Sequence, residues 1–266
     1  MIVFPGQTCQ LTVTITGADD DVDPYQLVHL SRFYPFVEWG ILSSEKRRGT
    51  SRYPVARYPS FHWIRELEGL ARSHEMQLSM HLCGAESRLA ATSGREFRPH
   101  PPWGRVQLNG YEPGTADQHW RSRGFRYILQ ARSVETLGDV WRDALVADAD
   151  ILFDPSGGAG KGPGSWPSMP LGELGNGSGV PSGFAGGISP ENIEDVLAEI
   201  VSKNKRLISV WIDMESGVRS GGDKVAEEKY GMADQSKFDL DKVKAVLEVV
   251  RKFRQREQAF VDEKLR

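Results

Sequence analysis

Apolar and polar residues alternate along residues 10–16 (Q-L-T-V-T-I-T), and β-branched side chains fill most of these positions. This pattern predicts a β-strand. Similar short apolar or alternating segments recur along the chain, and helical spacing separates most of them. Further strands are predicted over 36–42, 76–83, 105–109, 125–131, 150–154, 183–186 and 207–213. Helices are predicted over 25–33, 60–73, 85–93, 134–147, 190–203 and from 239 onward.

Strands that alternate with helices indicate parallel βαβ units. Eight such units in a chain of 266 residues match the size of a (β/α)8 TIM barrel. A doubly wound α/β sheet is the alternative, but no G-x-G-x-x-G turn follows the first predicted strand. We therefore expect a single TIM-barrel domain over residues 1–266. A long loop rich in glycine, proline and serine, 155–182, follows its sixth strand.

Period-two alternation also predicts which side chains point into the barrel. Polar residues occupy the inward positions toward the carboxyl ends of the strands, where TIM barrels carry their active sites. These residues are Thr12, Thr14, Thr16, Gln77, Ser79, His81, Cys83, Gln107, Asn109, Gln130, Arg132, Asp154 and Asp213. We expect a site at this rim. The alternative for any one of these residues is a hydrogen-bonded polar layer inside the barrel.

Three glycine-containing loops carry the candidate ligand-binding backbone. Asp154 ends a short apolar strand, and a glycine-rich loop that can approach a ligand closely follows it. Gly186 and Gly187 follow the seventh predicted strand, and Ser216 and Gly217 follow the eighth. In TIM barrels these last two loops often bind a phosphate through backbone N–H groups. Alternatively, the glycines only terminate the strands.

The composition of the chain limits the cellular compartment and the classes of binding partner that we expect. The formal net charge of -3 provides no basic surface for nucleic acid. Two cysteines argue against a disulfide framework and fit a reducing cytosol. No apolar run approaches the roughly 20 residues of a membrane span, and no signal peptide precedes residue 10. These features predict a cytoplasmic protein without nucleic-acid or membrane partners, and no clustered His or Asp pattern predicts a metal. The charged C-terminal helix is expected to pack either on the barrel or on a second copy of the chain. The second alternative would give a homodimer.

Six short motifs, taken in order, resemble the phosphoribosylanthranilate isomerase family of tryptophan biosynthesis, whose members are TIM barrels. They are T-I-T-G (14–17), T-S-R-Y (50–53), Q-L-N-G-Y-E (107–112), F-D-P-S-G-G-A-G (153–160), A-G-G-I-S-P-E-N (185–192) and I-D-M-E-S-G-V (212–218). The resemblance implies an Amadori rearrangement of a phosphoribosylated amine, catalysed by general acid and general base without metal or cofactor.

The resemblance also implies roles for individual residues. Asp154 matches the general acid, and Arg52 matches the arginine that binds the substrate's aromatic carboxylate. Asp213 matches an acid on the last strand, and Asn109 replaces a histidine; with Arg132 they are the other substrate-binding candidates. The phosphate would be bound by the glycine loops at Gly186, Gly187, Ser216 and Gly217.

The chain departs from this family at the base, where Thr16 replaces a cysteine. A thiol reaches its thiolate near neutral pH, and an unaided threonine hydroxyl does not. Three interpretations follow. The isomerase activity is retained with Asp19, His81 or Cys83 as the base; the protein is an acid–base enzyme for another phosphorylated sugar or amine; or it is a non-catalytic barrel that binds a phosphate ligand. The plain alternatives are a hydrogen-bonded core histidine for His81 and an inert thiol for Cys83.

Overall fold

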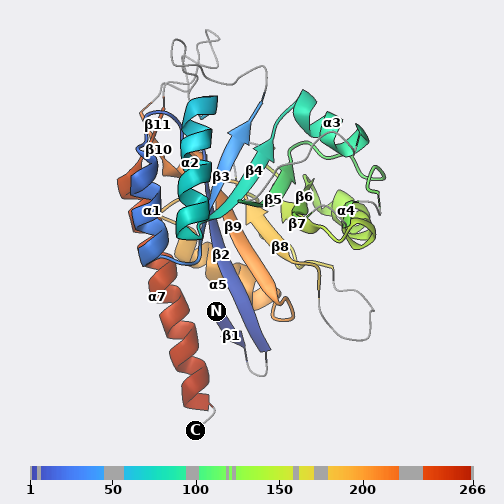
Figure 1. The fold of residues 1–266 in the computed structure, drawn as a ribbon. Helices are drawn as coiled ribbons and strands as arrows, with labels where there is room; N and C mark the ends of the chain where they lie inside the picture. The colour runs from blue at the N-terminus through green and yellow to red at the C-terminus, as the bar shows by residue number, and fades with distance from the viewer. Residues whose placement is uncertain are drawn as a thin grey trace.

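Eight parallel strands close into a barrel in the computed structural model (Figure 1). The model describes residues 2–4, 7–44, 57–93, 102–117, 120–121, 124–157, 162–170, 179–221 and 236–264. The strands follow one another around the sheet in chain order, and the last pairs in parallel with the first. They are β2 (Gln7–Thr16), β3 (Val37–Ser43), β4 (Gln77–Leu82), β5 (Trp103–Leu108), β6 (Arg126–Ala131), β7 (Asp150–Phe153), β8 (Ser182–Ala185) and β9 (Ser209–Met214). The fold is a TIM barrel, as the alternation predicts.

Helices surround the barrel. They are α1 (Pro24–Phe33), α2 (Phe61–His74), α3 (Ala85–Ser93), α4 (Val134–Ala147), α5 (Ile193–Lys203) and α7 (Leu240–Lys264). Capping side chains begin α1, α2 and α4. The Ser60 side chain accepts a hydrogen bond from the Trp63 amide, as expected of an N-cap. Within the described ranges, no helix has the length and apolar character needed to cross a bilayer.

One helix starts later than its predicted boundary at residue 190, because a side chain closes a turn in front of it. Asn192 accepts a hydrogen bond from the Ser189 amide and donates one to the Gly187 carbonyl oxygen. Residues 190–192 therefore form a turn, and α5 begins at Ile193. The consequence is that the loop after β8 is held in shape by its own side chain.

Three very short strands and a short helix are absent from the sequence prediction. β1 (Ile2–Phe4) pairs antiparallel with the start of β2, and β10 (Arg219–Ser220) pairs antiparallel with β11 (Lys237–Phe238). The 3-10 helix η2 (Ser216–Val218) directly follows β9. Segments of two or three residues show no periodicity, so pattern reasoning does not find them.

The barrel interior is layered along its axis. Its middle layer is a small apolar cluster, separate from the main core between strands and helices, formed by Ile128, Leu152, Ala185 and Trp211. Charged side chains lie toward the amino ends of the strands, at Glu38, Arg105 and Asp150, and polar side chains lie toward the carboxyl ends, at Thr16, Gln130 and Asp213. The Trp211 ring occupies the space beside Gly183, where any Cβ would overlap the indole. Gly183 is thus needed for the largest side chain of the interior to fit.

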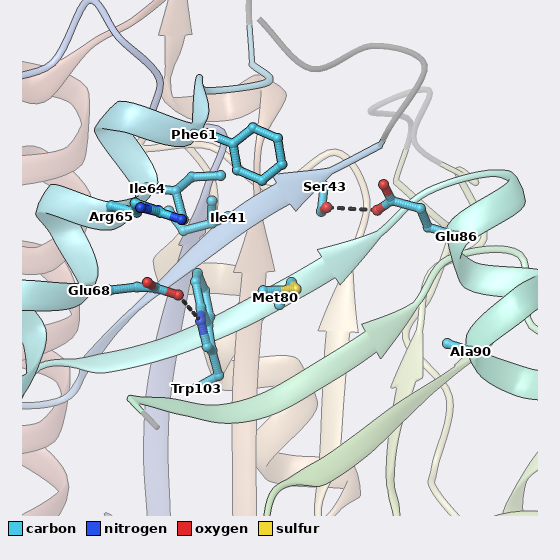
Figure 2. Close-up of a pocket in the computed structure, with 10 residues that line it drawn as sticks. All are labelled: Ile41, Ser43, Phe61, Ile64, Arg65, Glu68, Met80, Glu86, Ala90 and Trp103. Atoms are coloured by element: carbon cyan, nitrogen blue, oxygen red, sulfur yellow. Dashed lines mark hydrogen bonds between the residues drawn. The ribbon is translucent and has the colours of Figure 1, made fainter. Parts of the chain in front are cut away.

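A cavity of about 380 Å³ lies outside the barrel, between α2 and α3 (Figure 2). The outward faces of β3, β4 and β5 form its wall through Ile41, Met80 and Trp103. The Trp103 indole donates a hydrogen bond of 2.7 Å to Glu68 at its edge. None of the predicted site residues lines this cavity, so it is separate from the barrel mouth.

Candidate acid–base site at the barrel mouth

Asp213 lies near the carboxyl end of β9, and its side chain is almost fully enclosed. It is 6% exposed, and the Thr16 hydroxyl on neighbouring β2 donates a hydrogen bond of 2.8 Å to its Oδ1. Burial raises the pKa of Asp213 to about 7, and the Thr16 hydrogen bond lowers it only in part. The negative charge of Asp154 adds to the increase. A carboxyl group of this kind exchanges a proton readily at neutral pH.

His81 of β4 faces the same carboxyl group without forming an ion pair. Its Nδ1 is 4.0 Å from Asp213 Oδ2, and its Nε2 shares a hydrogen bond of 3.1 Å with the Ser79 hydroxyl. Burial lowers the pKa of His81 to about 4. The imidazole is therefore uncharged at neutral pH, and the contact joins a neutral ring to a carboxyl group that is about half protonated.

Gly40 of β3 allows these three side chains to meet. A Cβ at position 40 would overlap the Thr16 hydroxyl and would lie 2.9 Å from the His81 ring. Strands β2 and β3 pair Thr16 directly with Gly40. Only glycine leaves room for this approach, since every other residue carries the Cβ.

Asp154 follows β7 at the same rim and has a different environment. Its Oδ2 accepts a hydrogen bond of 2.8 Å from Gln130 Nε2, and its Oδ1 accepts from the Ser156 amide at 3.0 Å and the Ser156 hydroxyl at 2.6 Å. Three donors thus face Asp154, whereas one faces Asp213. Two carboxyl groups held in contrasting environments are typical of sites that divide proton transfer and charge stabilisation between them.

A row of hydrogen-bonded polar side chains lies at the carboxyl ends of β4 and β5. Gln107 Nε2 donates to Asn109 Oδ1 at 2.7 Å, and Asn109 Nδ2 donates to Cys83 Sγ at 3.1 Å. The Gln107 Oε1 atom is buried and has no hydrogen-bond partner among the described residues. A buried acceptor without a partner is costly, so this atom is a candidate acceptor for a ligand hydroxyl or amine.

The two predicted phosphate loops lie against each other. A Cβ at Gly217 in η2 would overlap the carbonyl oxygen of Ile188, which places the loop after β9 in contact with the loop after β8. Gly186 and Gly187 both have positive φ, at 105° and 65°. From the loop after β7, Gly162 approaches this pair, since its Cβ would lie 3.5 Å from the Gly186 carbonyl oxygen. Three loops therefore meet at one side of the mouth.

Arg132 directly follows β6 and lies beside the start of the loop after β7. Its guanidinium lies over Gly157, whose Cβ would come within 3.4 Å of it, and near Gly110. The side chain is exposed and makes no hydrogen bond or ion pair with any residue that the structure describes. It is an available cation for an anionic ligand group.

Asp19 is placed differently from what a general base requires. The carboxylate pairs with the buried Arg219 guanidinium at 3.2 Å and accepts a hydrogen bond of 2.8 Å from the Arg57 amide. Arg219 also donates to the Gly17 carbonyl oxygen, so the pair ties the loop after β2 to β10. Arg52, the predicted carboxylate-binding residue, lies outside the described residues.

Sequence reasoning missed Gly40 and Arg219, and it assigned Asp213 to substrate binding only. A glycine inside the strand motif F-V-E-W-G-I-L was a usable signal of close approach. No sequence signal exists for the pKa of Asp213, because its causes lie on other strands. In the described part of the chain, no group of three or more His, Cys, Asp or Glu side chains is arranged to hold a metal ion.

Comparison with known proteins identifies no family for this chain. No family model matches the chain, and no curated protein matches it. One similar solved structure is a truncated form of 3-deoxy-D-arabino-heptulosonate 7-phosphate synthase from Thermotoga maritima. It is 8% identical with a TM-score of 0.49, and the match covers 93% of this chain and 88% of that chain. A phospho-2-dehydro-3-deoxyheptonate aldolase (DAHP synthase) from the same organism is 10% identical with a TM-score of 0.47, over 92% and 68%.

The predicted membership of the phosphoribosylanthranilate isomerase family is therefore wrong. The similar solved structures are DAHP synthases, and no family model or curated protein supports the isomerase. The physical reason is that an acid at a strand end and glycines in the last two loops suit any TIM-barrel mouth that binds an anion. Such motifs identify the fold but not the reaction.

Proposed function

We propose that this protein is an acid–base enzyme that acts on a small phosphorylated sugar or amine at the barrel mouth. The observation that carries the proposal is the environment of Asp213, whose burial raises its pKa to about 7 beside the three-donor site of Asp154. A proton-transfer group is most effective when its pKa lies near the working pH. Structural carboxylates have no such requirement.

The surrounding residues support a hydroxyl-rich, anionic substrate. Asp213 exchanges a proton with a carbon or oxygen of the substrate, and Asp154 accepts a hydrogen bond from a substrate hydroxyl. Gln107 offers its unpartnered Oε1 to a second donor. The adjoining backbone of Gly187 and Gly217 suits a phosphate, and Arg132 suits a further negative charge.

Hydrogen–deuterium exchange tests this without knowledge of the product. The protein is incubated in D2O with a panel of aldose phosphates, ketose phosphates and phosphorylated amino sugars, and proton NMR follows loss of C–H signals next to a carbonyl or imine carbon. We expect exchange in at least one phosphorylated compound and none in its dephosphorylated counterpart. Asp213→Asn should slow this exchange by about 10²–10⁴-fold.

A surface acid provides the matched control. Asp139 of α4 pairs with Arg142 at 2.8 Å on an exposed helix face, so Asp139→Asn should leave exchange unchanged. Binding of panel compounds without exchange would replace the enzyme with a non-catalytic phosphate-binding barrel. If no panel compound bound or exchanged, the proposal would be overturned.

A further inference from the structure

One hydrogen bond and one ring contact orient the carboxyl group of Asp213. Thr16 holds Oδ1 at 2.8 Å, and the His81 ring stands 4.0 Å from Oδ2. Ser79, two residues before His81, fixes the opposite edge of the ring at 3.1 Å. All four side chains are buried, at 6% exposure or less. With Oδ1 occupied, Oδ2 is the atom left to exchange a proton.

We propose that Thr16 and His81 are the positioning residues of Asp213, with Thr16 fixing Oδ1 by its hydrogen bond and the His81 ring facing Oδ2. The inference rests on the proposed function and deepens it by assigning the machinery around its proton-transfer group. A charged imidazole would form an ion pair with the carboxylate and stabilise the ionised form. An uncharged ring leaves the protonated form populated at neutral pH.

The charged groups around this cluster favour the same state. The charges of Asp154 after β7, Glu215 after β9 and Glu38 of β3 all raise the pKa of Asp213. His81 faces Glu38, whose charge raises its pKa, and Arg105 of β5, whose charge lowers it. Because these two charges oppose each other, burial dominates at His81 and keeps it neutral.

Carboxyl carbon NMR of aspartate-labelled protein tests the role of Thr16 without any substrate. The Asp213 resonance is assigned by its loss in Asp213→Asn, and its midpoint is followed against pH. We expect a wild-type midpoint near 7. Thr16→Val keeps the shape and removes the donor, so the midpoint should rise; Thr16→Ser should restore it. An unchanged midpoint in Thr16→Val would overturn the assignment to Thr16.

The imidazole resonances of the same protein test the role of His81. We expect His81 to remain neutral as the pH falls to about 4, well below the ordinary histidine value of about 6.5. Titration of His81 near that ordinary value would overturn its assignment. A purely structural histidine in a hydrogen-bonded core has no need to stand beside a carboxyl group that titrates near neutral pH.

Gly40→Ala tests whether the cluster of Thr16, His81 and Asp213 requires a residue without a Cβ at position 40. The added methyl group should displace Thr16 and raise the Asp213 midpoint in the same direction as Thr16→Val. Gly69→Ala in α2 is the control, because a Cβ at that position meets nothing within 4 Å. An unshifted midpoint in folded Gly40→Ala would remove Gly40 from the proposal, and the Thr16 pair keeps the test decisive if Gly40→Ala does not fold.

The positioning proposal and the proposed function fail in different experiments. If the Asp213 midpoints are as expected but no deuterium exchange occurs, only the proposed enzyme activity is refuted. Exchange with an unshifted midpoint in Thr16→Val would refute only the positioning. If both hold, the pH profile of exchange should move with the Asp213 midpoint in each Thr16 variant.

Discussion

The two ends of this barrel differ in how completely their buried charged side chains are paired. We call the end at the amino termini of the strands the floor and the end at their carboxyl termini the mouth. At the floor, Arg105 donates to Glu38 at 2.9 Å and pairs with Asp150 at 3.3 Å, and Arg126 pairs with Asp150 at 2.9 Å. At the mouth, Asp213 has one hydrogen bond and no cationic partner among the described residues. Complete pairing is what structure requires of a buried charge. The incomplete pairing at the mouth supports the proposed proton-transfer role of Asp213.

For Glu38 and Asp213 the difference is visible in the direction of the pKa shifts, whereas at Asp150 burial outweighs the charges of Arg105 and Arg126 and raises the pKa. Burial alone would raise the pKa of Glu38, but the charge of Arg105 and its hydrogen bonds overcome burial and lower it. Burial of Asp213 meets no such opposition, and its pKa rises to about 7. Two acids enclosed by the same barrel thus differ because one faces a guanidinium and the other does not.

Removing the floor cation should have the largest effect. Arg105→Met leaves Glu38 and Asp150 buried with fewer partners, and breaking a buried pair in this way costs about 3–5 kcal/mol. The free energy of unfolding from urea titration measures it. Arg142→Met removes an exposed pair on α4 and should cost under about 1 kcal/mol. Equal losses in the two variants would contradict the importance of pairing at the floor.

Removing the acid at the mouth should change the free energy of unfolding in the opposite direction. The folded-state pKa of Asp213 is raised, so the stability it contributes is present below its unfolded value and is lost as pH rises through about 7. Asp213→Asn should therefore stabilise the fold at pH 8 by about 2–4 kcal/mol, with a smaller gain at pH 5. The pKa of His81 is lowered to about 4, so the stability that His81 contributes is lost as pH falls through that value. This loss occurs in the wild type and in Asp213→Asn alike. Urea unfolding at the two pH values checks the sign, and a loss of stability at pH 8 would argue that Asp213 is structural.

The apolar layer between floor and mouth should respond to added volume. Gly183→Ala would press a methyl group against the Trp211 ring, and overpacking of this kind costs about 1–3 kcal/mol. Gly69→Ala on α2 meets nothing and should stabilise by about 0.5–1 kcal/mol through its helical propensity. Urea unfolding of both variants makes the comparison. A neutral Gly183→Ala would mean that the Trp211 layer can shift without loss.

The pattern of the chain predicts the barrel because each strand carries its own alternation. It also places Thr16, His81 and Asp213 inward, since inward positions follow from period two. It does not predict their contacts: Thr16 and Asp213 are 197 residues apart in the chain and meet only when β9 closes on β2. The pairing of Asp19 with Arg219 depends on a two-residue strand that has no periodicity.

The central claim is that Asp213 at the mouth titrates near neutral pH while Glu38 at the floor stays ionised. Carboxyl carbon NMR of wild-type protein labelled in aspartate and glutamate measures both groups in one titration, with Asp213→Asn and Glu38→Gln providing the assignments. The account predicts a midpoint near 7 for Asp213 and a midpoint below 4.5 for Glu38. A midpoint for Asp213 at the ordinary aspartate value of about 4 would contradict it.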